Sequence, residues 1–89
     1  MIISKSLLAG LVSIPLLDKK PGRKYIAVQN HDPANFVVVT FGGLDAQTSP
    51  PNGMVIKAGE FGEINGHQLG GPIRIIADTA PCQTSVFFD

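Results

Sequence analysis

The 89-residue sequence contains no tryptophan, one tyrosine and one cysteine, and only 16% of its residues are charged. Because Cys82 has no partner in the chain, an internal disulfide is excluded. A soluble globular domain typically has about 25% charged residues, so part of this surface must be uncharged. The formal net charge of zero also removes the repulsion that keeps copies of a protein apart. Self-association is therefore expected.

The sequence also lacks a segment that would span a bilayer. The apolar residues 6–17 are too few, are interrupted by Pro15, and are followed by charged residues instead of a secretory cleavage site. We therefore expect no membrane partner, and synthesis in the cytoplasm with the N-terminus retained. A basic cluster lies at residues 19–24, but zero net charge and few aromatic rings argue against a nucleic-acid partner.

Residues that could carry chemistry are few and form no known motif. The candidates are His31, His67 and Cys82, together with seven carboxylates. Glu63 and His67 would share a helix face, but an Asn-Gly turn between them ends any helix and removes the metal-ligand spacing. The glycines do not follow a phosphate-binding pattern. We expect no catalytic, cofactor-binding or metal-binding residues, and therefore not an enzyme.

Apolar residues make up 44% of the chain and follow the pattern of β-strands. From residue 24 onward, short apolar runs alternate with clusters of glycine, proline, asparagine and aspartate. The clearest strand, residues 35–41, is apolar on both faces, so we expect a second sheet or another subunit to cover each side. The other predicted strands are residues 14–17, 24–29, 54–57, 61–64, 73–77 and 83–88, and residues 44–53 form the longest loop.

Seven or eight short strands predict an all-β fold, either a small antiparallel β-sandwich or a jelly-roll-like barrel. We expect a single domain over residues 14–89, preceded by an apolar N-terminal arm at residues 1–13. Only residues 5–12 have any helical character, and Gly10 weakens it. A chain this short buries only about 60% of the surface of its unfolded state, so contacts with partners are expected to add stability.

Two polar residues lie at the ends of the predicted strand 24–29. An arginine in the place of Arg23 can hydrogen-bond the carbonyls of a neighbouring turn through its guanidinium group. An asparagine in the place of Asn30 readily caps the turn that follows. We predict that Arg23 and Asn30 hold together the fold or its assembly. Phe36, Val38 and Phe41 are the candidates for packing between subunits.

The order of these segments resembles a group of small phage virion proteins. The matching segments are residues 21–30 (PGRKYIAVQN), residues 36–43 (FVVVTFGG), the turn at residues 55–60 (VIKAGE) and the last two strands, residues 72–77 and 84–88. The resemblance covers residues 14–88. It implies a β-sandwich of the capsid decoration, head-fibre-base or tail-associated type, located in the virion and without catalytic residues. Because the apolar residues 2–17 are unlike a polar linker to a fibre, a minor capsid or decoration protein fits better.

We therefore expect a non-enzymatic structural component of a phage virion, which self-assembles symmetrically and docks on virion proteins such as the major capsid protein. The alternative is a small carbohydrate- or ligand-binding β-sandwich that uses the loops at one end. Sugar sites rely on exposed aromatic rings, and the chain offers no tryptophan and only Tyr25 within a strand. A third possibility, a small hydrolase or metalloenzyme, has no motif to support it.

Overall fold

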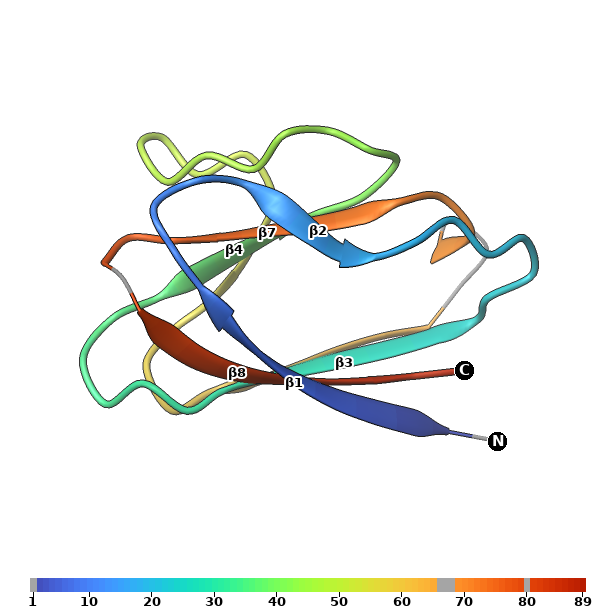
Figure 1. The fold of residues 1–89 in the computed structure, drawn as a ribbon, viewed down its shortest axis with the longest axis horizontal. Helices are drawn as coiled ribbons and strands as arrows, with labels where there is room; N and C mark the ends of the chain where they lie inside the picture. The colour runs from blue at the N-terminus through green and yellow to red at the C-terminus, as the bar shows by residue number, and fades with distance from the viewer. Residues whose placement is uncertain (1, 66–68, 80) are drawn as a thin grey trace.

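The computed structural model describes residues 2–65, 69–79 and 81–89, and these residues form an all-β fold (Figure 1). Seven strands lie where the sequence predicts them, with ends that differ by two residues or fewer, and an eighth, β1, was not assigned. The strands are β1 (Ile3–Ala9), β2 (Ile14–Leu17), β3 (Tyr25–Asn30), β4 (Val37–Thr40), β5 (Met54–Ile56), β6 (Phe61–Asn65), β7 (Ile73–Ala77) and β8 (Cys82–Phe88).

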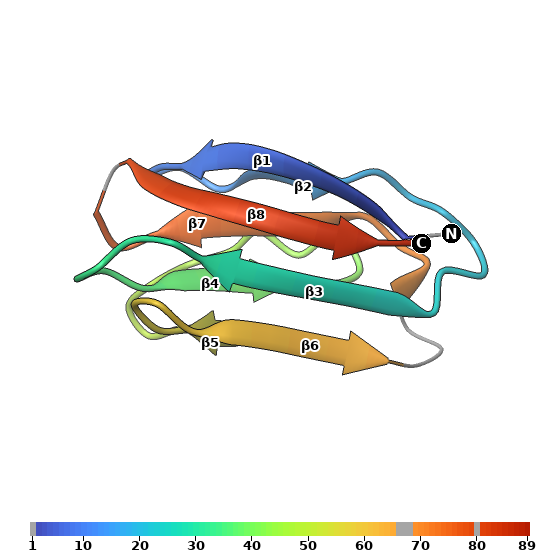
Figure 2. The ribbon, with the colours of Figure 1, turned by 90° about the horizontal axis from the view of Figure 1, so that it is seen from below.

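The strands form two antiparallel sheets packed face to face (Figures 1 and 2). Sheet A has the strand order β1-β8-β3-β6, and sheet B has the order β2-β7-β4-β5. Each early strand pairs with a late one: β1 with β8, β2 with β7, β3 with β6, and β4 with β5. Eight strands paired in this order form a jelly roll, one of the two predicted all-β arrangements.

The core lies between the sheets and is made of alternate residues of facing strands. Ile26 and Val28 of β3 and Val37 and Val39 of β4 have no exposed surface. Burying such a side chain contributes about 1.5–3 kcal/mol, so this layer is the main source of stability. The same cluster includes Ala9, Leu16, Leu17, Ile56, Leu69, Ile73, Ile75, Ala77, Cys82 and Val86.

The outer face of sheet B is covered by the loop at residues 41–53. Val38 points to this face from β4 and is fully buried with Ala46 of the loop and Ile76 of β7. Phe36 packs against the same cluster. The strand is therefore covered on both sides, as its apolar pattern predicts, but this chain supplies both covers. Val38 does not lie on a surface that another subunit could reach.

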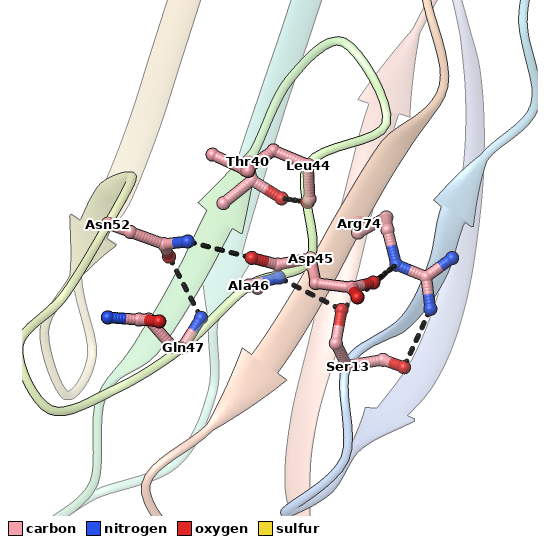
Figure 3. Close-up of polar contacts among 8 residues, drawn as sticks. All are labelled: Ser13, Thr40, Leu44, Asp45, Ala46, Gln47, Asn52 and Arg74. Carbon is pink, nitrogen blue, oxygen red and sulfur yellow. Dashed lines mark hydrogen bonds and ion pairs between the residues drawn. The ribbon is translucent and has the colours of Figure 1, made fainter.

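Ser13, which precedes β2, joins this loop to sheet B (Figure 3). Its hydroxyl oxygen accepts the backbone N–H of Ala46 at 3.0 Å. Arg74 of β7 donates to the same hydroxyl at 2.9 Å and to the Ser13 carbonyl at 2.8 Å. The Arg74 guanidinium also lies 3.2 Å from the carboxylate of Asp45. These contacts hold the first half of the loop against sheet B.

The second half of the loop is closed by Asn52 and Gly53. The Asn52 side chain accepts the N–H of Gln47 at 2.8 Å and donates to the Asp45 carbonyl at 2.7 Å (Figure 3). The chain then passes so close to β4 that a Cβ atom on Gly53 would overlap the Val39 carbonyl oxygen. Only glycine fits at that approach. The loop is therefore an ordered part of the scaffold.

Residues 3–9 form β1 at the edge of sheet A, paired with β8 from Ile3–Phe88 to Ala9–Cys82. This differs from the predicted N-terminal arm at residues 1–13 and from helical character at residues 5–12. The physical reason is the pairing with β8, which places Leu7 and Ala9 against the core while Leu8 faces outward. The segment therefore belongs to the same domain as residues 14–89.

Asn30, at the end of β3, links the two sheets and has no exposed surface. Its side-chain amide donates to the carbonyls of Asn35 at 2.8 Å, Ile56 at 3.1 Å and Lys57 at 3.2 Å. Its side-chain oxygen accepts the backbone N–H of Asp32 at 2.9 Å. One side chain thus ties sheet A to the β3–β4 loop and to the end of β5 in sheet B.

We expect Asn30→Ala to lower the free energy of unfolding by about 3 kcal/mol, because it leaves buried carbonyls without donors. Urea unfolding followed by circular dichroism measures this change. The matched control is Asn65→Ala on the exposed end of β6, for which a change within about 0.5 kcal/mol is expected. Equal unfolding midpoints for the two variants would contradict the role assigned to Asn30.

Candidate functional site

Among residues 2–65, 69–79 and 81–89, no loop covers the outer face of sheet A, in contrast to sheet B. In Figure 2 its four strands lie side by side, with no other described segment in front of them. The antiparallel register places Ser4, Phe87, Ala27 and Glu63 in one row across the four strands. Because side chains alternate along a strand, Tyr25 and Phe61 point to the same face as this row. An open surface is thus built from the outward positions of all four strands.

Aromatic side chains gather on this face. Ile2, Tyr25, Phe61 and Phe87, here termed the aromatic patch, line an open hollow of about 430 Å³. The rings of Phe61 and Phe87 have centroids 6.3 Å apart and are tilted by 49°. Phe61 is 51% exposed and Ile2 is 54% exposed. The patch therefore presents apolar surface directly to solvent.

A carboxylate stands at the border of the patch. The Tyr25 hydroxyl donates a hydrogen bond to Glu63 Oε2 at 2.8 Å. This bond to the carboxylate raises the pKa of Tyr25 above its ordinary value, so the phenol remains protonated at neutral pH. The pair holds one oxygen of Glu63 in place and leaves a charged acceptor beside the apolar rings.

A second group of polar side chains lies on the same face, further along the strands. His31 Nε2 lies 2.8 Å from the Ser85 hydroxyl oxygen, which is 3.5 Å from that of Ser6. A serine–histidine pair is the nucleophile-and-base arrangement of hydrolases, but such a site also needs a third group that orients the histidine. Asp32 does not act in this way, since it accepts the N–H groups of Ala34 and Asn35 at 2.8 Å. Those bonds lower the pKa of Asp32.

The other residues with potential chemistry do not converge. Within residues 2–65, 69–79 and 81–89, no group of three metal-ligating side chains comes together. Cys82 is buried, and burial, with Asp32 and Asp78 nearby, raises the pKa of its thiol to about 11. The thiol therefore remains protonated and poorly nucleophilic at neutral pH. His67 lies outside the described residues.

Arg23 lies in the loop that joins β2 to β3 and is only 4% exposed. Its Nη1 donates to the carbonyls of Asp18 at 3.2 Å and Leu69 at 3.4 Å. Its guanidinium also lies 5.7 Å from the ring centroid of Phe88. These contacts join the β2–β3 loop to the segment before β7 and to the end of β8. They are contacts of the kind expected for an arginine beside a turn.

None of the five residues predicted to hold the fold or its assembly belongs to the aromatic patch. Arg23, Asn30 and Val38 are buried, and Phe36 and Phe41 pack partly against the two core clusters. The sequence alone does not reveal the patch, because its members come from β3, β6, β8 and the residue before β1, which lie far apart in the chain. Tyr25, Phe61 and Phe87 lie at outward positions of their strands, but only the pairing register brings them together.

No known protein-family model matches the sequence, and no curated protein is significantly similar to it. Among the described residues, no helix is long and apolar enough to cross a membrane. The geometry of the outer face of sheet A is therefore the main structural guide to function.

We expect Arg23→Ala to lower the stability by about 2 kcal/mol, because two carbonyls lose their donor and a buried side chain is removed. In a domain of this size this corresponds to a fall in Tm of about 10 °C, measured by scanning calorimetry. Arg23→Met retains an apolar stem and should recover part of the loss. Lys24→Ala, an exposed neighbour, is the control, and an Arg23→Ala Tm equal to that of this control would refute the role.

Proposed function

We propose that the protein is a non-enzymatic structural component of a phage virion, a minor capsid or decoration protein. It assembles symmetrically with copies of itself and docks on virion proteins such as the major capsid protein. The observation that carries the proposal is the aromatic patch on the uncovered face of sheet A. Large apolar groups gathered on a protein surface usually mark a site that another molecule covers.

The composition of this face matches that of a protein interface. The centre of an interface is rich in aromatic residues and poor in charge, and its rim is polar. Tyr25, Phe61 and Phe87 supply the aromatic centre. Ser6 and Ser85 lie on the same face and supply uncharged polar groups. Such a surface fits a protein partner with an apolar contact region.

The rigidity of the scaffold supports the same role. The face is made of strands rather than loops, and Asn30 links sheet A to sheet B at the end of β3. A surface that is ordered before binding loses little conformational entropy when a partner covers it. A small jelly roll of this kind can therefore act as a preformed plug or cap on a larger particle. The resemblance of residues 14–88 to small virion proteins points to a phage particle.

We expect the double variant Phe61→Ser, Phe87→Ser to remain folded but to fall at least tenfold in copies per virion. A virus deleted for the gene is complemented with each variant, and purified virions are analysed by quantitative mass spectrometry. The control is Leu44→Ser, because Leu44 is similarly exposed, at 54%, but lies on the loop over sheet B. If the wild-type chain is absent from purified virions, the proposal fails.

Binding of a carbohydrate or another small ligand is a second candidate, and the hollow favours it. Its volume of about 430 Å³ lies within the range of ligand sites, and three aromatic rings line it. Aromatic rings stack on the apolar faces of sugars, and the Glu63 carboxylate beside Tyr25 could accept their hydroxyl groups. Under this second proposal the site lies on the face of sheet A, instead of in the loops at one end of the sandwich that the sequence analysis considers.

For this second function, we expect a glycan array to give binding above background, and Glu63→Gln to weaken that binding about tenfold through loss of a charged acceptor. Circular dichroism verifies that the variant is folded. Gln83→Glu, which changes an exposed residue of β8 outside the hollow, serves as the control. Wild-type signals at background across the array would exclude carbohydrate binding.

A further inference from the structure

The edge strands of the two sheets differ in how well they are protected against pairing with another chain. Natural edge strands are protected by short length, proline, bulges or charge. β5 has three residues, β2 contains Pro15 and a register shift, and β6 contains Gly62 and Glu63. β1 has seven residues, a continuous register with β8, and Lys5 as its one charge. It is the least protected edge in the described fold.

The backbone groups on the free side of β1 follow from the hydrogen-bond pattern of sheet A. The N–H of His31 donates to the carbonyl of Gln83 at 2.9 Å, so Gln83 and alternate residues of β8 direct their backbone groups toward β3. The backbone groups of the residues between these point toward β1. Through the register of β1 on β8, the N–H and C=O groups of Ser4, Ser6 and Leu8 then point away from the sheet. No other described strand pairs with this side of β1.

Exposed apolar side chains are concentrated in β1 and in the residues next to it. Of the eight large apolar side chains exposed among the described residues, five lie in residues 2–12. At half to three-quarters exposure each offers about 100 Å², so together they provide on the order of 500 Å² per chain. With the backbone and serines of β1, this approaches the roughly 800 Å² per partner of a stable interface. The five are Ile2, Ile3, Leu8, Leu11 and Val12, at 54%, 48%, 58%, 64% and 72% exposure.

We propose that β1 pairs antiparallel with β1 of a second copy across a twofold axis, so that sheet A continues through both subunits. This inference rests on the self-assembly in the proposed function and specifies its surface and symmetry. A register centred on Lys5 would place two like charges opposite each other. A register centred on Ser6 places Lys5 opposite Leu7 of the second copy and pairs every free backbone group of the edge. The dimer therefore takes the register centred on Ser6.

This arrangement has a consequence for docking. The twofold axis of an antiparallel strand pair is perpendicular to the sheet, so both copies present the same sheet face to the same side. The two aromatic patches then lie on one continuous surface of eight strands. Two patches on one unit bind a particle with higher overall affinity than a single patch, because the second contact forms at high effective concentration.

The test uses Ser6→Pro, which removes the central free N–H of β1. Proline is tolerated at such an edge position, because that N–H has no partner in the monomer. Size-exclusion chromatography with light scattering should give wild-type protein at twice the chain mass of 9.4 kDa and Ser6→Pro at 9.4 kDa. Asn65→Pro on the opposite edge of sheet A is the control and should remain dimeric. A monomeric wild type at 100 µM, or a dimeric Ser6→Pro, would overturn the proposal.

A disulfide test reports on the register. In the proposed dimer the two Ser6 Cα atoms are about 5.5 Å apart, within the range that a disulfide bridges. We expect Ser6→Cys to form a cross-linked dimer on oxidation, while Ser4→Cys remains uncross-linked; the reverse result rejects this register. Virion incorporation is measured separately. If the protein is monomeric but is found in virions, the β1 dimer is disproved and the docking proposal stands. If the protein is dimeric but is absent from virions, the docking proposal is disproved and the β1 dimer stands.

Discussion

The position of β3 between β8 and β6 is the constraint on which the other features depend. Because side chains alternate along a strand, a shift of one residue would move Ile26 and Val28 out of the core and bring Tyr25 and Ala27 into it. Hydrogen bonds hold the strand at both ends. The buried Asn30 side chain binds carbonyls in sheet B, and the Asp89 carboxylate accepts the N–H groups of residues 24 and 25. The core and the outer aromatic patch are thus consequences of the same register.

The two outer faces of the sandwich differ in exposure because one loop covers sheet B. On sheet B, residues 41–53 fold back over Val38 and are held there by Ser13, Arg74 and Asn52 (Figure 3). On sheet A no described segment does the same, and the aromatic patch stays open. Burying one face within the chain adds a second apolar layer to a limited core and so contributes to the stability of the small domain. The other face is the one through which we propose that the protein contacts other molecules.

The low proportion of charged residues in the chain can be related to two of its surfaces, the aromatic patch and the edge of β1. The aromatic patch and the edge of β1 adjoin at Ile2, and both consist mainly of uncharged residues. Charged side chains would protect such surfaces from association, as they do on the surfaces of monomeric proteins. Their scarcity here agrees with the contacts proposed for these two surfaces. The buried, protonated Cys82 and the turn-forming Asp32 have structural rather than chemical environments.

The sequence by itself determined the all-β class, seven of the eight strands and the polar loop at residues 44–53, because period-two alternation and turn residues are local properties. It did not identify β1, since the crowded apolar residues of the segment, such as Leu7 and Leu8, do not by themselves reveal which side faces the core. Tertiary structure alone decided that the loop would cover Val38 and that Tyr25, Phe61 and Phe87 would meet. Both depend on strand pairing between distant parts of the chain, which no local pattern specifies.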